Sequence, residues 1–364
     1  MKHLRISLVF LACLALTATL TTHLSGCAGP AFYAQAVSGH MKLMRSRVPV
    51  SELLDDPATD PELASRLHQA NNIRAFAHNE LGLTNNDSYS QFAPTGKEAV
   101  TWNVVAAPEF SVNPRLWCFP VSGCVPYRGY FDEDKARSFA EKMKAKSFDV
   151  MISPAIAYST LGWFDDPLLD TMLQYSDAQL AGIMFHELAH EKLYVKSDTA
   201  FSEAFAGFVE ETGVQLWLEK TGQEDQLAQW QAGKQAALDF NRLLQDVRQQ
   251  LQEIYMKKLP EEAKLALKRE ALLEWSNRYR ELVEQQWNGV DYFATWMSGE
   301  LNNAHLALMN SYEGGSCAFT ALYAQAGHEL EPFYVLAEQK ASLGAEQRSA
   351  WLGRPCDNQV TSTQ

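Results

Sequence analysis

A His-Glu-x-x-His pattern that begins at His186 is the feature that most constrains how this chain of 364 residues can fold. Apolar residues spaced along one helix face surround the pattern, and Ser176 or Asp177 can cap the start of that helix. In a helix, His186 and His190 lie one turn apart on the same face, so both imidazoles can bind one zinc ion. Glu187 lies beside them, where it can take a proton from the attacking water and give it to a leaving amine. The pattern therefore predicts a helix that carries a catalytic zinc site.

The residues that follow can supply the third zinc ligand. A catalytic zinc is held by three protein ligands and keeps one open position. We expect the first helix to run about five residues past His190, followed by a turn at 196–199 and a second helix in which Glu203 reaches the same zinc. Glu210 would point into the same cleft, and it is our candidate for binding the free amine of a substrate. Glu210 and Glu211 also stay open as alternative ligands, as partners of a histidine or as surface residues. The sequence thus predicts one Zn²⁺ per chain.

Other residues can bind a peptide substrate and stabilise its reaction. A strand that precedes the zinc helix can pair with the substrate backbone by β-augmentation, and it offers Ala157, Tyr158 and Ser159 for this. A tetrahedral oxyanion also needs a hydrogen-bond donor near the zinc. Tyr312 is our candidate for this catalytic role and Tyr194 is a second, with ordinary packing as the alternative for both.

The N-terminal residues have the composition of a secretory signal. Basic residues precede an apolar run that is too short to span a bilayer, and residues 1–26 contain no acid. The segment ends Ser25-Gly26-Cys27, which resembles the lipobox of bacterial lipoproteins, where the cysteine is lipidated and becomes the mature N-terminus. This resemblance implies a membrane anchor on Cys27. Because Ala28 follows, it also implies sorting to the outer membrane, facing the periplasm. An ordinary signal peptide is the alternative.

The cysteines after Cys27 are even in number, which indicates disulfides in an oxidising compartment. Cys118 and Cys124 flank a turn and form the leading pair. Cys317 and Cys356 are then the second pair by default. A cysteine-rich metal site is the alternative reading of these residues.

Composition and element pattern limit the fold and the partners. Lys and Arg total 31 against 44 acidic residues, and the net charge of −13 argues against a nucleic-acid partner. The elements predict an α+β fold, mainly α, with a small β region and a C-terminal helical bundle. We expect, in chain order, a helix over 51–81 broken near Pro57 and Pro61, a β region over 98–131, a helix over 132–146, a strand over 148–160, and helices over most of 176–343, including a pair at 223–258 and 261–287 hinged at Pro260. The expected division is a signal peptide at 1–26, a tether at 27–48 and one peptidase domain at 49–364.

The zinc segment resembles a known group of enzymes. The motif at 186–190, followed by Ser202-Glu203-Ala204-Phe205-Ala206, is similar to gluzincin metallopeptidases, whose third zinc ligand is a Glu in a Glu-x-x-Ala helix. The closer resemblance is to a family of bacterial lipoproteins described as predicted aminopeptidases. It is carried by the segments 117–124, 127–130, 158–162 and 301–304 together with the zinc segment. The resemblance implies a zincin-like helix and a zinc-dependent aminopeptidase that releases N-terminal residues from peptides.

Two other functions stay open at this point. One is a zinc endopeptidase of the cell envelope, which would also cut peptides whose N-terminus is blocked. The other is a lipoprotein scaffold or chaperone, in which zinc is structural or absent and Glu187 has no catalytic role.

Overall fold

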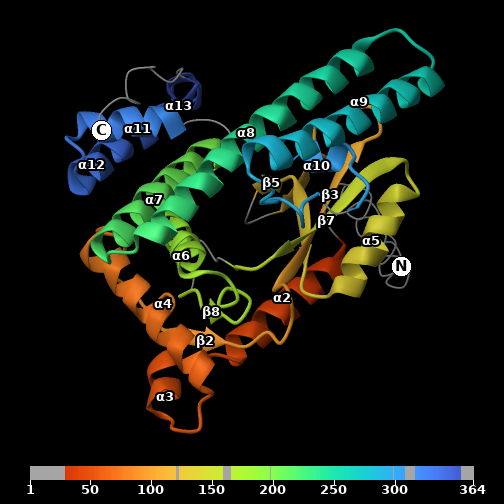
Figure 1. Cartoon of the computed structure of the whole chain (residues 1–364). Helices are drawn as coiled ribbons and strands as arrows, with labels where there is room; N and C mark the ends of the chain where they lie inside the picture. The colour runs from red at the N-terminus through yellow and green to blue at the C-terminus, as the bar shows by residue number, and fades with distance from the viewer. Residues whose placement is uncertain are drawn as a thin grey trace, which may run out of the picture.

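The computed structural model describes residues 29–119, 123–158, 165–196, 198–297, 299–307 and 316–353. Within these ranges the chain is mainly helical with small β-sheets, which confirms the expected α+β class (Figure 1). The expected signal peptide, its lipidation site Cys27 and the candidate residues Ser159, Tyr312 and Cys356 lie outside the described residues. None of the described helices combines the length and the apolar composition needed to cross a membrane.

The first helices agree with the break that two prolines predict. Asp60 caps the longer helix by accepting hydrogen bonds from the backbone N–H groups of Glu62 and Leu63. A small sheet with strand order β1-β2-β8 lies beside them, in which β2 runs antiparallel to β1 and parallel to β8. The elements are α3 (Val50–Asp55), α4 (Pro61–Asn79), β1 (Val48–Pro49), β2 (Gln91–Ala93) and β8 (Leu168–Leu169).

The main sheet is antiparallel and has the strand order β6-β3-β7. Helix α5 covers one face of it (Figure 1). The strand expected over 148–160 ends at Ala155. A short hairpin of β4 and β5 contains the disulfide Cys118–Cys124. These elements are β3 (Thr101–Pro108), β4 (Trp117–Phe119), β5 (Gly123–Val125), β6 (Tyr127–Tyr130), α5 (Glu133–Lys144) and β7 (Phe148–Ala155).

Two adjacent helices, α6 (Asp177–Lys192) and α7 (Thr199–Lys220), form the centre of the molecule. Ser176 caps α6 in a capping box with Gln179, and Asp198 caps α7. The first helix ends at Lys192, sooner than the five residues past the second histidine that we expected. Buried side chains of both helices join one large apolar core.

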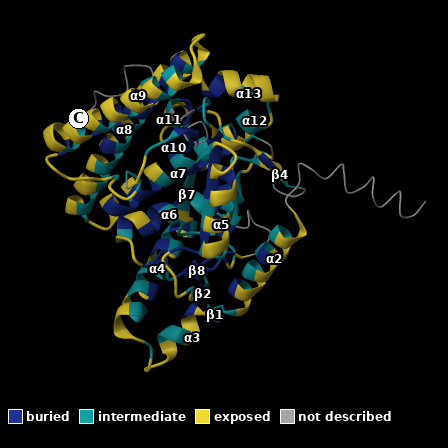
Figure 2. Cartoon of the chain, turned by 90° about the vertical axis from the view of Figure 1, so that its right-hand side faces the viewer, coloured by how far each residue is buried: buried dark blue, intermediate teal, exposed yellow. Residues whose placement is uncertain are grey.

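The long charged pair of helices forms the predicted hairpin, which projects from the body (Figure 1). Its outward faces are exposed (Figure 2). The segment 287–302, expected within the helical part, has no regular helix among its described residues. The remaining helices are α8 (Glu224–Met256), α9 (Glu261–Glu281) with its π-helical continuation η1 (Leu282–Gln286), α10 (Asn303–Ala307), α11 (Ser316–Gln325), α12 (Leu330–Ala341) and α13 (Ala345–Leu352).

The segment 27–48, expected as a tether, instead contains the packed helix α2 (Pro30–Arg45). The Phe32 ring lies 5.5 Å from that of Phe119, and the Arg128 guanidinium lies 4.2 Å from the Phe32 ring centroid. Leu43, at the other end of the helix, is 6% exposed in the main core. Apolar and aromatic contacts at both ends therefore fix this helix on the folded body, which corrects the tether prediction.

Candidate metal centre

Three side chains from α6 and α7 converge in the centre of the molecule. The Nε2 atom of His186 lies 3.3 Å from one carboxylate oxygen of Glu203, and the Nε2 atom of His190 lies 3.6 Å from the other. One potential ligand atom from each of the three residues lies within 4.8 Å of the other two. The side chain of His190 is 5% exposed and the other two are 19% exposed. The helices thus bring together the three ligands predicted from the sequence.

The spacing of these atoms suits a zinc ion. Two ligands that each lie about 2.0–2.1 Å from a tetrahedral zinc are about 3.3–3.4 Å apart. The distances from the two histidine nitrogens to Glu203, 3.3 Å and 3.6 Å, are close to this separation, and each nitrogen faces a different oxygen of the carboxylate. Two imidazole nitrogens and one carboxylate are also the donors found in catalytic zinc sites that keep a fourth position open. The three residues therefore offer the donor types, at about the spacing, that a single metal ion such as zinc would need.

The charges of the cluster also favour a bound cation. Although burial opposes its charged form, hydrogen bonding to Glu203 and Glu210 raises the pKa of His186 to about 10. Burial likewise opposes the charged form of Glu203, but His186 and His190 lower the pKa of its carboxyl to about 2. A buried carboxylate that is ionised at neutral pH needs a positive partner, and a divalent cation can replace the proton on the imidazole.

Glu210 contacts the same histidine from the opposite side. Its Oε2 lies 3.1 Å from Nδ1 of His186, and its Oε1 accepts a hydrogen bond of 3.4 Å from Nζ of Lys234. Burial opposes ionisation of this carboxyl, but the hydrogen bond from His186 and the charge of Lys234 lower its pKa. Both oxygens of the residue expected to bind the substrate amine are therefore already engaged. Glu211, the other alternative ligand, is exposed on α7.

Hydrogen bonds from residues earlier in the chain hold the end of α6 that carries the histidines. Glu191 follows His190 directly, and its two carboxylate oxygens accept hydrogen bonds from Asn86 Nδ2 at 2.5 Å and from Ser88 Oγ at 2.7 Å. Ser88 is completely buried. This contact limits rotation of the last turn of α6, so it stabilises the direction in which the second histidine points.

Two tyrosines lie near the cluster and remain accessible. The Tyr194 ring centroid is 5.9 Å from that of His190, and Tyr194 is 41% exposed. Tyr127, the first residue of β6, is 38% exposed. Partial burial, followed by the charges of Glu203 and Glu187, raises the pKa of Tyr127, while burial and Glu203 raise the pKa of Tyr194. Both phenols therefore lie within electrostatic range of the carboxylate of Glu203.

Sequence reasoning did not identify Tyr127 as a site residue. It belongs to the segment 127–130, which carried part of the family resemblance, but no spacing connects that segment to the histidines. The fold brings Tyr127 within electrostatic range of Glu203 and Glu187, and no local pattern encodes this proximity. Lys234 was missed for the same reason, because it lies on α8.

The segment that we expected to pair with the substrate backbone packs against the core instead of extending strand β7. Ala157 and Tyr158 lie beyond the end of β7, and both pack against the main core. The hydroxyl of Tyr158 lies 3.2 Å from Nδ1 of His40 on α2, and the carbonyl of Ile156 accepts a hydrogen bond of 2.5 Å from Thr171. These side chains connect the segment to α2 and to the core.

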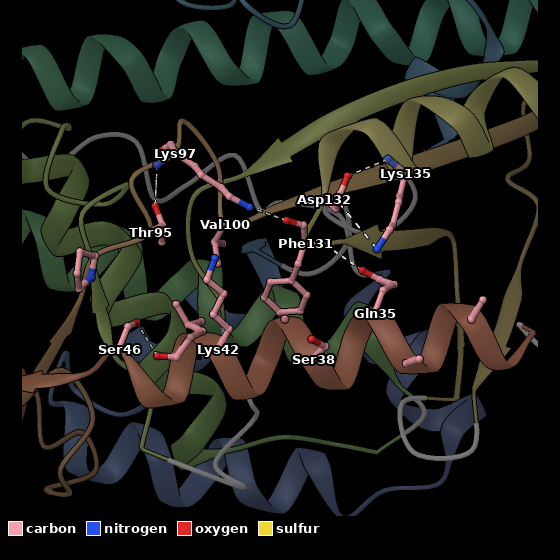
Figure 3. Close-up of a pocket in the computed structure, with 15 residues that line it drawn as sticks. Gln35, Ser38, Lys42, Ser46, Thr95, Lys97, Val100, Phe131, Asp132 and Lys135 are labelled. Atoms are coloured by element: carbon pink, nitrogen blue, oxygen red, sulfur yellow. Dashed lines mark hydrogen bonds and ion pairs between the residues drawn. The ribbon is translucent and has the colours of Figure 1, made fainter.

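A separate cavity of about 560 Å³ lies between α2 and the body (Figure 3). Lys42, Lys97 and Lys135 surround it together with apolar side chains. A Cβ atom at Gly39 would lie 2.2 Å from Phe131, so this wall of the cavity depends on a glycine in α2. None of the residues that line the cavity belongs to the metal centre.

Comparison with protein families gives one finding. The family model described as "Putative aminopeptidase" matches residues 31–352, which is most of the chain and includes every residue of the metal centre. The match begins inside α2 and ends in α13. Comparisons with curated proteins and with solved structures gave no match.

Proposed function

We propose that this chain, which belongs to the family described as "Putative aminopeptidase", is a zinc-dependent aminopeptidase that releases N-terminal residues from peptides. The observation that carries the proposal is the convergence of two Nε2 atoms and one carboxylate at the spacing of zinc ligands. His186, His190 and Glu203 would hold the ion. One zinc per chain follows, because this is the one such cluster among the residues that the structure describes.

The residues around the cluster suit peptide hydrolysis. Zinc, when bound, supplies a Lewis acid that polarises the scissile carbonyl. Glu187 follows His186 on α6 and is partly buried, so it can take a proton from the attacking water and pass it to the leaving amine. Tyr127 and Tyr194 can donate hydrogen bonds to the oxyanion, because both phenols are accessible and near Glu203.

We also propose that the protein is a lipoprotein of the bacterial envelope, anchored at Cys27 and facing the periplasm. The lipobox-like end of the signal segment supports this location. The disulfide between Cys118 and Cys124 supports it as well, because such bonds persist in oxidising compartments. A Cys27→Ser variant would then be released from the membrane fraction, whereas a variant that stays with the membrane argues against the anchor.

One observation favours a second candidate function. An aminopeptidase needs an acidic group for the free amine of its substrate, and Glu210, our candidate, is engaged with His186 and Lys234. A zinc endopeptidase does not need such a group. Whether cleavage requires a free amine on the substrate thus distinguishes an aminopeptidase from an endopeptidase.

Zinc content and cleavage measured together test the proposal. The mature domain without Cys27 should contain one zinc, lose it in Glu203→Ala, and cut only peptides with a free N-terminus. Cleavage of N-acetylated peptides as well would establish an endopeptidase. The Glu187→Gln variant should keep zinc and fold while its kcat falls by roughly 10²- to 10⁴-fold. A wild type without zinc, or an active Glu187→Gln variant, would instead favour the non-catalytic scaffold.

A further inference from the structure

A partly buried ion pair lies behind His186, on the side of the ring opposite Glu203. Glu210 Oε2 contacts Nδ1 of the histidine at 3.1 Å, and Lys234 Nζ contacts Oε1 of the same carboxylate at 3.4 Å. The Lys234 ammonium also lies 4.8 Å from the ring centroid of Trp230, one turn earlier on α8. A chain of contacts therefore leads from α8 through α7 to the proposed metal ligand on α6.

The three helices pack closely around this chain of contacts and partly exclude water from it. The side chains of His186, Glu210 and Lys234 are 19%, 24% and 30% exposed, so water screens them only in part. Gly182 lies one turn before His186 on α6. A Cβ atom there would lie 3.2 Å from Trp230 and 3.4 Å from the Glu210 carboxylate. The glycine thus allows α7 and α8 to approach the helix where the ion pair forms.

The two histidines differ in how they are oriented. The buried Nδ1 atom of His190 has no hydrogen-bond partner among the described residues. Nδ1 of His186, in contrast, has a carboxylate partner. A carboxylate on Nδ1 fixes the ring so that its Nε2 lone pair faces the metal, and it increases the basicity of that nitrogen. Of the two histidines, His186 is therefore the one whose ring is oriented by a carboxylate on Nδ1.

We propose that Glu210 and Lys234 are positioning residues that hold the His186 ring with Nε2 directed at the metal, so that α8 sets the metal affinity of the site. The inference rests on the proposed zinc site and assigns Glu210 a role away from the substrate amine. Lys234 acts through Glu210, because its ammonium contacts Oε1 and so holds the carboxylate with Oε2 directed at the ring. Neither residue needs to touch the substrate.

Zinc affinity of the folded protein tests this inference. The zinc dissociation constant would be measured by competition with a chelator for the wild type and for Glu210→Gln, Lys234→Met and Lys234→Arg. We expect roughly 10- to 100-fold weaker binding for Glu210→Gln, the range found when partners of metal ligands are removed. Lys234→Met should weaken binding by a smaller factor, and Lys234→Arg should restore it. The thermal unfolding of the metal-free variants would show that each one folds.

A matched control separates this role from the loss of any lysine ion pair. Lys220 pairs with Glu80 on the surface, where the two side chains are 58% and 42% exposed, and Lys220→Met should leave zinc affinity unchanged. Wild-type affinity in both Glu210→Gln and Lys234→Met would overturn the inference while the proposed function stands. A wild type that binds no zinc would overturn the proposed function together with this inference.

Discussion

Glu203 and Glu210 lie two turns apart on α7, and their carboxylates meet opposite nitrogens of the same imidazole. His186 is therefore held from both sides, and its position does not depend on a bound ion alone. Each carboxylate also has a second partner, His190 for Glu203 and Lys234 for Glu210. This arrangement would pre-form the geometry of the proposed zinc ligands, which reduces the cost of ordering side chains on binding.

At the same scale, Tyr127 is the residue whose catalytic role can be tested most directly. If its phenol donates to the oxyanion, Tyr127→Phe should lower kcat by roughly 10²- to 10³-fold and change KM and zinc content little. Peptide cleavage kinetics with zinc-loaded protein give the result. Tyr175→Phe is the control, because Tyr175 is also accessible, at 36%, and is not part of the metal centre. Unchanged kcat in Tyr127→Phe would remove this residue from the mechanism and leave Tyr194 and Tyr312.

Single residues of the site differ in how far sequence could identify them. His186 and His190 are one turn apart on one helix, so helical geometry alone predicts that they face one ion. The prediction of Glu203 also required a turn of the right length before α7, and Asp198 caps the start of that helix. The side of the imidazole that Glu210 contacts depends on Lys234 of a third helix, and no periodicity within α7 contains that information.

At the scale of elements, local signals predicted the helices better than the strands. Ser176 and Asp198 are side-chain caps that the sequence displays, and α6 and α7 begin next to them. Pro260 separates α8 from α9 as expected. The strands β1, β2 and β8 have two or three residues each, which is too short for an alternating pattern to be visible. Their pairing depends on contacts between distant segments.

Helix α2 gives a prediction about where the folded domain begins. A chain that starts at Gly29 keeps this helix, whereas a chain that starts at Pro49 loses the contacts of Phe32 and Leu43. Removing a buried leucine such as Leu43 typically costs about 2–5 kcal/mol, and the partly buried Phe32 adds to this, so we expect the shorter chain to be at least about 2 kcal/mol less stable. Urea unfolding of both chains measures this difference. Equal stability would support the tether that we first expected.

At the scale of the whole molecule, the short helix α10 joins the hairpin to the main sheet. Arg248 of α8 donates to the carbonyl of Leu306 at 3.0 Å, and Asn303 donates through Nδ2 to the carbonyl of Glu109 at 2.9 Å. Lys268 of α9 donates to Asp149 of β7 at 2.6 Å. These buried polar contacts connect segments that are far apart in the sequence. Their partners could not be predicted from composition or periodicity, because each depends on how the hairpin lies against the sheet.

His305 lies in this junction and makes the stability of the whole molecule depend on pH. It is 7% exposed, and its Nδ1 accepts a hydrogen bond of 3.2 Å from the backbone N–H of Asn302. Burial lowers its pKa from 6.5 to about 4. The neutral ring is the form that fits the fold, so its contribution to stability is complete above pH 6.5. Stability is then lost as the pH falls from 6.5 to about 4, because the unfolded chain binds a proton first.

The resulting prediction compares the pH dependence of unfolding in two proteins. Between pH 7.5 and pH 4.5 this histidine should reduce the free energy of unfolding by roughly 2–3 kcal/mol, the linkage expected for such a shift in pKa. His305→Gln keeps an acceptor for Asn302 but cannot gain a proton, so its stability should fall less over the same range by about that amount. Urea unfolding at both pH values, under the same metal conditions for both proteins, measures the difference. If the two proteins lose stability in parallel, another group causes the acid sensitivity, and His305 is not the group that links the junction to pH.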